Sequence, residues 1–202
     1  MKIAVLASGR GSNLQALIDE WLEGSLPVEF MGVGSDQIKA QALLRAEKVG
    51  IPTRAFPREN YPDKQAQEDD ILNWLEELGV ELLVLAGYMR ILSPYFIRRA
   101  ECLIVNIHPS LLPAFPGLNA QRQALEYGVK VSGCTVHFVD EGMDTGPIIM
   151  QEAVPVYEED TVETLSQRIL QVEHKIYPEA IRLIALGKVE CQGRKVTIKR
   201  HS

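Results

Sequence analysis

The sequence has no long hydrophobic run. No apolar stretch approaches the roughly 18 residues that a membrane-spanning helix needs. The apolar run at the N-terminus is also too short for a signal peptide, because glycine and arginine follow Ser8 at once. We therefore expect a protein without a membrane partner.

Cysteine is scarce. The three cysteines, Cys102, Cys134 and Cys191, are an odd number and none lies in a CxxC pair. This usage argues against a disulfide framework or a zinc site and suits a reducing compartment. We expect a cytoplasmic protein in which all three thiols are buried as small apolar side chains.

Positive charge is not in excess either. Lysine and arginine number 21 against 27 acidic residues, which gives a net charge of -6. Proteins that grip nucleic acid usually present a basic face, so no nucleic-acid partner is expected. With 202 residues, 46% of them hydrophobic, the chain has enough apolar side chains to bury the core of one domain.

Short apolar runs alternate with segments of helical periodicity through the first half of the chain. This alternation predicts a parallel, doubly wound sheet with right-handed crossovers. The expected strands are 2–7, 28–34, 52–56, 81–86 and 102–107, and the expected helices are 13–23, 38–48, 64–78 and 94–99.

After His108 the pattern changes. A proline-rich irregular stretch, 110–117, precedes a helix at 120–127, and the long strands expected at 133–139 and 147–156 have no helix between them, so they should pair antiparallel. A helix at 161–186, kinked or split at Pro178, and a hairpin at 188–199 complete the chain.

The predicted fold is thus α/β, a mostly parallel, Rossmann-like sheet with antiparallel strands toward the C-terminus. We expect a single domain, 1–202, with a first half at 1–108 and a second at 109–202.

A glycine-rich turn follows the first strand. Gly11, Ser12 and Asn13 lie where backbone N–H groups at a helix start favour an anion, so a phosphate site is chemically sensible. Ser12 could also cap the helix. A dinucleotide site is an alternative, with Asp36 as the ribose-binding acid, but Leu14 occupies the third glycine position of that fingerprint. A tight turn without a ligand is the other alternative.

Asn106 and His108 lie where the fifth strand ends. Residues two apart in a strand point to the same side, and ligands of open parallel sheets bind at the carboxyl ends of strands. An amide and an imidazole there could stabilise an oxyanion and move a proton. Structural roles, a turn cap and a carbonyl hydrogen bond, remain an alternative on spacing alone.

Asp144 lies in the loop DEGMDTG. Asp140, Glu141 and Asp144 together offer a metal site as an alternative, but the spacing matches no standard calcium loop and the histidines are scattered. We therefore expect no metal. A carboxylate beside His108 would instead orient the imidazole and favour its protonated form.

Five ordered blocks of sequence resemble the phosphoribosylglycinamide formyltransferase family, folate-dependent enzymes of purine biosynthesis. The similarity extends over nearly the full chain. The blocks are VLASGRGSNLQAL at 5–17, VLAGYMRILSP at 84–94, NIHPSLLPAFPG at 106–117, GCTVHFVDEGMDTGPII at 133–149 and EHKIYP at 173–178.

The resemblance implies a formyltransferase fold and formyl transfer from the co-substrate 10-formyltetrahydrofolate to the amine of 5-phosphoribosylglycinamide, without a metal. It implies His108 as general acid, Asn106 as oxyanion partner and contact to the folate, and Asp144 as the acid that tunes the histidine. It places the substrate phosphate at Gly11, Ser12 and Asn13, the glycinamide end at Glu173, and the folate along Lys64, Met89, Arg90, Ile91 and Leu92.

The chain departs from the family's pattern at a few positions. Lys64 stands where relatives often carry an arginine, which keeps the charge but loses the bidentate fork. Asn119 and Gln121 stand where relatives usually have histidines, which puts in doubt a proton-transfer or phosphate role for that segment. No surface stripe in the sequence indicates an oligomeric state.

Three other functions remain to be weighed. Methionyl-tRNA formyltransferase shares the Asn-x-His core but adds a basic C-terminal domain. Formyltetrahydrofolate hydrolase adds an N-terminal regulatory domain, which the position of the first strand argues against. A dinucleotide-binding module would bind NAD at the glycine-rich turn and make no use of Asn106 or His108.

Overall fold

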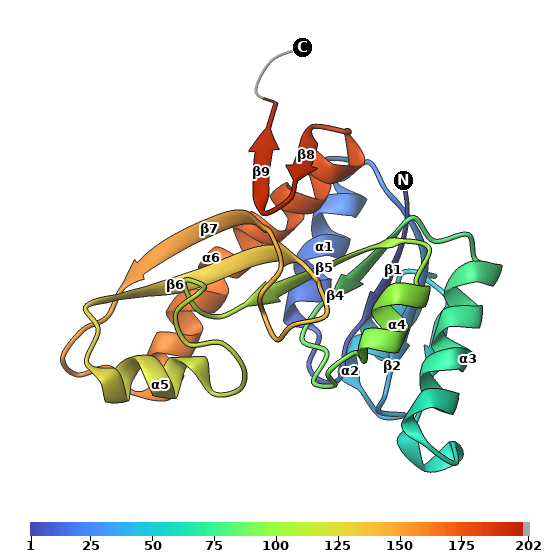
Figure 1. The fold of residues 1–202 in the computed structure, drawn as a ribbon, viewed down its shortest axis with the longest axis horizontal. Helices are drawn as coiled ribbons and strands as arrows, with labels where there is room; N and C mark the ends of the chain where they lie inside the picture. Colours follow the sequence, from blue (N-terminus) through green and yellow to red (C-terminus); the bar gives the residue numbers. More distant parts are fainter. Residues whose placement is uncertain (200–202) are drawn as a thin grey trace. The chain divides into compact units, whose positions relative to one another are not determined.

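The computed structural model describes residues 1–199. Its main sheet has seven strands in the order β3-β2-β1-β4-β5-β6-β7, and β8 and β9 form a separate hairpin (Figure 1). The strands are β1 (Lys2–Leu6), β2 (Glu29–Ser35), β3 (Thr53–Ala55), β4 (Leu82–Leu85), β5 (Leu103–His108), β6 (Val131–Phe138), β7 (Ile148–Pro155), β8 (Val189–Gln192) and β9 (Lys195–Ile198). The helices are α1 (Ser12–Leu22), α2 (Gln41–Glu47), α3 (Lys64–Glu77), α4 (Pro94–Arg99), α5 (Ala120–Tyr127) and α6 (Val162–Ala185), with a 3-10 turn at Arg58–Asn60.

The chain divides into two compact units, Met1–Val105 and Asn106–Ser202. The division falls inside β5, whereas the two halves expected from the sequence meet after His108. β1, β2, β3 and β4 pair in parallel, and β6 pairs antiparallel with β7, as predicted. The predicted fold class, a mostly parallel sheet with antiparallel strands toward the C-terminus, is therefore confirmed.

The first unit reverses its winding between β1 and β4. The chain moves outward from β1 to β3 and then crosses back to β4 on the other side of β1. Because such crossovers are right-handed, α1 and α2 cover one face of the sheet and α3 and α4 the other. The contacts agree, since α1 packs beside α2 and α3 beside α4. In sheets of this kind the crevice at the reversal, at the carboxyl ends of the strands, is where ligands bind.

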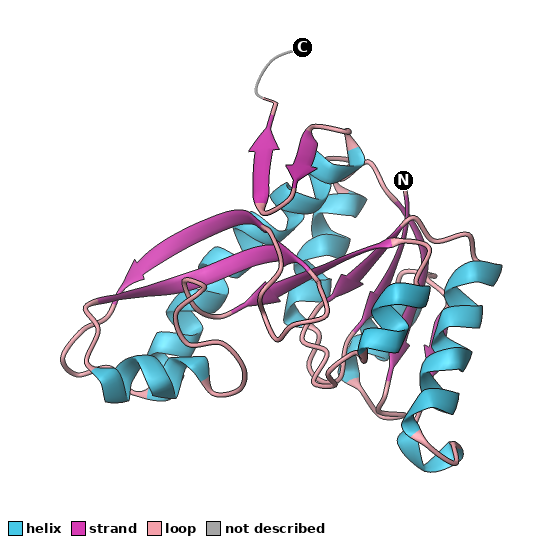
Figure 2. Cartoon of the chain, viewed as in Figure 1, coloured by secondary structure: helices cyan, strands magenta, loops and turns pink. Residues whose placement is uncertain are grey.

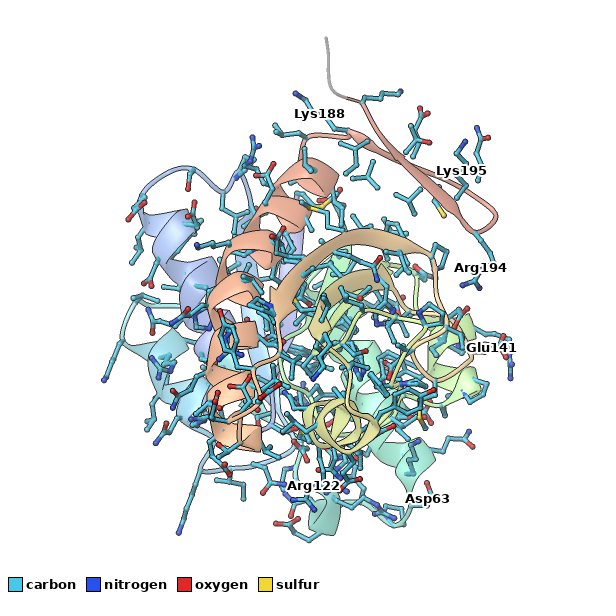
Figure 3. The ribbon with its side chains drawn as sticks, turned by 90° about the vertical axis from the view of Figure 1, so that its left-hand side faces the viewer. Asp63, Arg122, Glu141, Lys188, Arg194 and Lys195 are labelled. Atoms are coloured by element: carbon cyan, nitrogen blue, oxygen red, sulfur yellow. The ribbon has the colours of Figure 1, made fainter. Side chains whose placement is uncertain are left out.

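The second unit is built on a long antiparallel pair (Figure 2). α6 packs against both β6 and β7, and α5 packs against α6. A capping box starts α6, in which the Thr161 side chain accepts from Thr164 N and the Thr164 side chain accepts from Thr161 N. The helix continues through the buried Pro178, so the expected split is absent from α6. The β8–β9 hairpin carries Arg194 at its turn, and Arg194 Nη1 donates to Thr145 O at 2.9 Å (Figure 3).

Other expectations need correction. The N-cap of α1 is Gly11, in the left-handed region and without a side-chain cap, so Ser12 is the first helical residue and does not cap the helix. α2 begins at Gln41, whereas the helix was expected to begin at Ile38. The three thiols are free, but only Cys134 is buried, while Cys102 is half-buried and Cys191 exposed. Cys191 lies on an exposed two-stranded hairpin, which has no core of its own in which to bury it.

No helix within residues 1–199 is long and apolar enough to cross a membrane.

The close packing around Gly133 predicts that this position of the second unit does not tolerate a side chain. A Cβ there would lie 2.0 Å from Glu152 O and 2.8 Å from Leu111 Cδ2. We expect Gly133→Ala to lower the free energy of unfolding by at least about 2 kcal/mol, because backbone of the paired strand would have to move. Urea denaturation measures this. Val131→Ala, at an exposed position of the same strand, should change stability by less than about 0.5 kcal/mol, and equal effects of the two changes would contradict the prediction.

Candidate active site

Four polar side chains meet in the second unit. Asn106 and His108 come from the end of β5, His137 from β6, and Asp144 from the loop between β6 and β7. Asp144 lies between the two imidazoles, with its Oδ2 3.4 Å from His108 Nδ1 and its Oδ1 3.7 Å from His137 Nε2. Asn106 Nδ2 lies 3.4 Å from His137 Nε2. The structure thus brings together the three residues expected to act in catalysis and adds His137.

His108 has an oxygen acceptor opposite each ring nitrogen. Its Nε2 hydrogen-bonds Phe115 O at 2.8 Å, and its Nδ1 faces the carboxylate of Asp144. A neutral imidazole has one N–H and could donate to only one of these oxygens, whereas an imidazolium donates to both. The ring is 5% exposed, so neither acceptor is readily replaced by bulk water. The ring of His108 is therefore held between two oxygen acceptors.

Hydrogen bonds in two loops, the one that carries Gly117 and the one that carries Asp144, position the carboxylate of Asp144. Its Oδ2 accepts a hydrogen bond from Gly117 N at 2.8 Å, shorter than its distance to either imidazole. The backbone of Asp144 is in the left-handed region, with φ 53°. Asp140 Oδ1 accepts from Gly142 N at 3.1 Å and from Thr145 Oγ1 at 2.6 Å, which ties the loop across Asp144. The carboxylate is thus pre-positioned beside His108.

The loop that follows His108 is fixed from β6 and β7. Thr135 Oγ1 donates to Ser110 O at 2.7 Å and accepts from Leu112 N at 3.0 Å, in a fully buried position. Gln151 Nε2 donates to Leu112 O at 2.9 Å. These bonds hold the segment that leads to Phe115, whose carbonyl orients the ring of His108.

His137 is a site residue that sequence reasoning missed. Its Nδ1 hydrogen-bonds Phe138 O at 2.8 Å, and because a carbonyl only accepts, Nδ1 carries the proton. In the neutral ring Nε2 is then an acceptor for the amide of Asn106. Burial lowers the pKa of His137. This effect of burial outweighs Phe138 O and Asp144, both of which act to raise that pKa. A register shift in the β6–β7 pairing occurs between Val136 and His137, and such bulges re-aim side chains.

His137 stands seven positions before Asp144, within a block that resembles the family, and this was the only available signal for it. The histidines look scattered along the sequence, and only strand pairing brings the two rings to one carboxylate.

The expected phosphate turn is part of the first unit. Gly11 has φ 69°, and a Cβ there would lie 2.8 Å from Ala42, so only glycine fits this position. The first turn of α1 follows directly, and its backbone N–H groups give that end of the helix a partial positive charge. The turn can therefore receive an anion.

The expected folate segment also lies in the first unit, after β4. Met89 and Ile91 are each 64% exposed, whereas Leu92 is buried. Met89 N donates to Ser8 Oγ at 2.9 Å, which joins this segment to the start of the glycine-rich turn. Lys64 Nζ donates to Ile91 O at 2.7 Å, so Lys64 supports the segment that it was expected to accompany. Arg90 pairs with Asp36 at 2.9 Å.

Glu173 belongs to the second unit, on the buried face of α6. Burial raises the pKa of the Cys134 thiol, on β6, to about 12, and the negative charge of Glu173 contributes to the same shift. Asn119 is the N-cap of α5 with φ 58°, a left-handed conformation that asparagine tolerates. Across residues 1–199, no group of three or more His, Cys, Asp or Glu side chains is arranged to hold a metal ion.

The chain is similar to known proteins over nearly its whole length. Residues 1–181 match the family described as Formyl transferase. A phosphoribosylglycinamide formyltransferase from Bacillus subtilis (strain 168) is 48% identical over 181 residues, which cover 90% of this chain and 93% of that protein. A crystal structure of glycinamide ribonucleotide transformylase 1 from Symbiobacterium toebii has a TM-score of 0.95 and 52% identity, and the match covers 98% of this chain and 93% of that one.

The chain is also 51% identical over 188 residues to a trifunctional purine biosynthetic protein adenosine-3 from Bos taurus. That match covers 93% of this chain but only 19% of the relative, so the chain spans about a fifth of the length of this curated relative.

The burial of His137 predicts a pH dependence of stability. Because its pKa is lowered in the folded state from the ordinary 6.5, the unfolded chain binds more protons there, and stability should fall as pH falls below about 6.5. His137→Gln removes this group, so the stability of wild type relative to the variant should decline between about pH 7 and pH 5 in urea denaturation. Val131→Gln, on the same strand, should keep the wild-type dependence. Parallel curves for wild type and His137→Gln would contradict the assignment.

Proposed function

Since this chain belongs to the formyl transferase family, we propose that it transfers the formyl group of 10-formyltetrahydrofolate to the amine of 5-phosphoribosylglycinamide. The products are formylglycinamide ribonucleotide and tetrahydrofolate, in de novo purine biosynthesis in the cytoplasm. The observation that carries the proposal is the cluster in which Asp144 faces the buried His108, with Asn106 two residues before it on the same strand. The name of the Bacillus subtilis relative, nearly all of which this chain covers, supports the choice of substrate.

The proposed reaction begins with attack of the substrate's primary amine on the formyl carbon. A new C–N bond forms and the carbonyl oxygen gains negative charge, which needs hydrogen-bond donors that are already in place. Asn106 directs one amide hydrogen at His137 and keeps a second for the oxyanion. His108, protonated, supplies the other donor. Both groups lie at the end of β5, two residues apart on one side of the strand.

The intermediate collapses when the bond from the former formyl carbon to the folate nitrogen breaks. The leaving nitrogen takes up a proton, and the attacking amine loses one, so the reaction is balanced without a net proton. Asp144 supports His108 as the acid in this exchange, since a carboxylate beside an imidazolium stabilises the charged ring. Through a water molecule, Asp144 can also relay the amine proton toward the leaving nitrogen.

The remaining residues bind the two substrates. The phosphate of 5-phosphoribosylglycinamide binds at Gly11, Ser12 and Asn13, where the start of α1 favours an anion. Glu173 contacts the glycinamide end. The folate lies along Met89, Arg90, Ile91 and Leu92, with Lys64 near its tail and Asn106 at its formyl group.

A formyl-transfer assay tests the function directly. Purified protein should convert 5-phosphoribosylglycinamide and 10-formyltetrahydrofolate to products, and His108→Ala should lower kcat by at least ~10²-fold because the acid is lost. Glu158→Ala, at an exposed position, is the control and should keep wild-type turnover. Wild-type kcat in the folded His108→Ala protein would refute the role of the histidine. A melting temperature raised by NAD but not by a folate analogue would favour the dinucleotide-binding alternative.

The glycine-rich turn predicts that the phosphate matters for binding. Isothermal titration should give a Kd for the dephosphorylated nucleoside at least about tenfold above that for the phosphorylated substrate, since hydrogen bonds to a charged group would be lost. Equal dissociation constants would remove the phosphate role from Gly11, Ser12 and Asn13. An unchanged affinity for a folate analogue in the same titrations shows that the protein is intact.

A further inference from the structure

We propose that Asp36 is a positioning residue that fixes Met89 and Arg90 in the conformation that receives the folate. The inference deepens the proposed function and rests on it, because the role of the 89–92 segment in folate binding is part of that function. The carboxylate of Asp36 pairs directly with Arg90 at 2.9 Å, and Met89 N donates to the hydroxyl of Ser8, whose own proton is free to turn toward that carboxylate.

Asp36 is a buried charge at the end of β2. It is 4% exposed, and a carboxylate so placed must be hydrogen-bonded or paired to remain ionised. Its Oδ2 accepts from Arg90 Nε at 2.9 Å and from Gln37 Nε2 at 3.1 Å. Burial alone would raise the pKa of Asp36, but hydrogen bonds from Ser8, Arg90 and Gln37 outweigh it and hold the pKa below 3.8. The group is therefore a fixed negative charge at neutral pH.

Ser8 extends this charge to the backbone of the folate segment. Its Oγ accepts a hydrogen bond from Met89 N at 2.9 Å, and its hydroxyl proton is then available to the carboxylate of Asp36. Ser8 N also donates to Gly87 O at 3.1 Å. Ser8 follows β1, and Gly87 follows β4, so these bonds join the two strands at which the winding of the first unit reverses.

The segment needs such an anchor because its side chains supply little packing. Met89 and Ile91 are each 64% exposed and Arg90 is half exposed, so of the segment 89–92 only Leu92 is packed into the core. A second attachment lies at the far end, where Glu68 accepts from Ser93 N at 2.9 Å and Lys64 donates to Ile91 O at 2.7 Å. Ordering the segment before the ligand arrives removes part of the entropy loss that binding would otherwise carry.

The test compares Asp36→Asn with Asp70→Asn. Asp70 is a matched control, because it also pairs with an arginine, Arg54 at 2.8 Å, and accepts from a hydroxyl, Tyr61 at 2.7 Å. Asp36→Asn should raise the KM for 10-formyltetrahydrofolate about tenfold or more, since charge-assisted bonds are lost, with little change in kcat or in the KM for 5-phosphoribosylglycinamide. Asp70→Asn should leave all three at wild-type values.

Amide hydrogen exchange of Met89 is a second readout that does not depend on activity. The amide should be protected in wild type and in Asp70→Asn, and should exchange faster in Asp36→Asn and in Ser8→Ala. Ser8→Ala removes only the hydroxyl link, so it keeps the inference testable if Asp36→Asn does not fold.

The outcomes separate this inference from the proposed function. Absence of formyl transfer by the wild-type protein would refute the proposed function, while the exchange of Met89 would still report on the anchor. An active wild type with an unchanged folate KM and unchanged Met89 exchange in the Ser8 and Asp36 variants would overturn the anchor. An equal rise in both KM values for Asp36→Asn would also overturn it, since that result indicates a general structural effect.

Discussion

Asp144 is a carboxylate held largely away from water, with only 14% of its side chain exposed, and the candidate active site is organised around its need for donors. A poorly solvated charge is expensive unless it is hydrogen-bonded or paired. Here a backbone N–H from Gly117 and the imidazole of His108 meet that need. The same contacts orient His108. The loops that carry Asp144 and Gly117 are therefore both part of the candidate site.

The two histidines face one carboxylate but have different partners. Both ring nitrogens of His108 face oxygen acceptors, whereas His137 has an acceptor at Nδ1 and the amide of Asn106 at Nε2, which favours the neutral ring of His137. Burial lowers the pKa of His137 and works in the same direction. In the proposed reaction His108 serves as the acid, while His137 orients the amide of Asn106.

In the first unit, too, a carboxylate with hydrogen-bond donors lies beside a loop of the candidate site. Asp36 lies at the end of β2 and Ser8 at the end of β1, and together they reach the backbone and side chain of the segment after β4. A doubly wound sheet places these strand ends at one edge, so a single buried carboxylate can organise two loops that are far apart in sequence. In the first unit a buried acid pairs with a mostly exposed segment, and in the second a half-buried acid faces two imidazoles.

The sequence alone determined most of the fold. Apolar periodicity located the strands and helices of both units, because periods of 2 and 3.6 residues are local properties of the chain. It failed where local signals are ambiguous. Ser12 looked like a cap, but Gly11 takes that position because its left-handed backbone fits against Ala42. Cys191 looked like a core residue, but its hairpin has no core. Pro178 was expected to kink or split the last long helix, and α6 is not split there.

Part of the candidate site could likewise be predicted from the sequence, and part could not. The spacing of Asn106 and His108 was enough to place them on one side of a strand, because side chains alternate with a period of two. Only the tertiary structure decided that Asp144 lies 3.4 Å from His108, that His137 joins them, and that Asp36 pairs with Arg90. Each of these contacts joins residues that strand pairing and loop geometry bring together over long sequence separations. The protonation state of His137 follows from its burial and its partners, and the sequence shows neither the burial nor the partners.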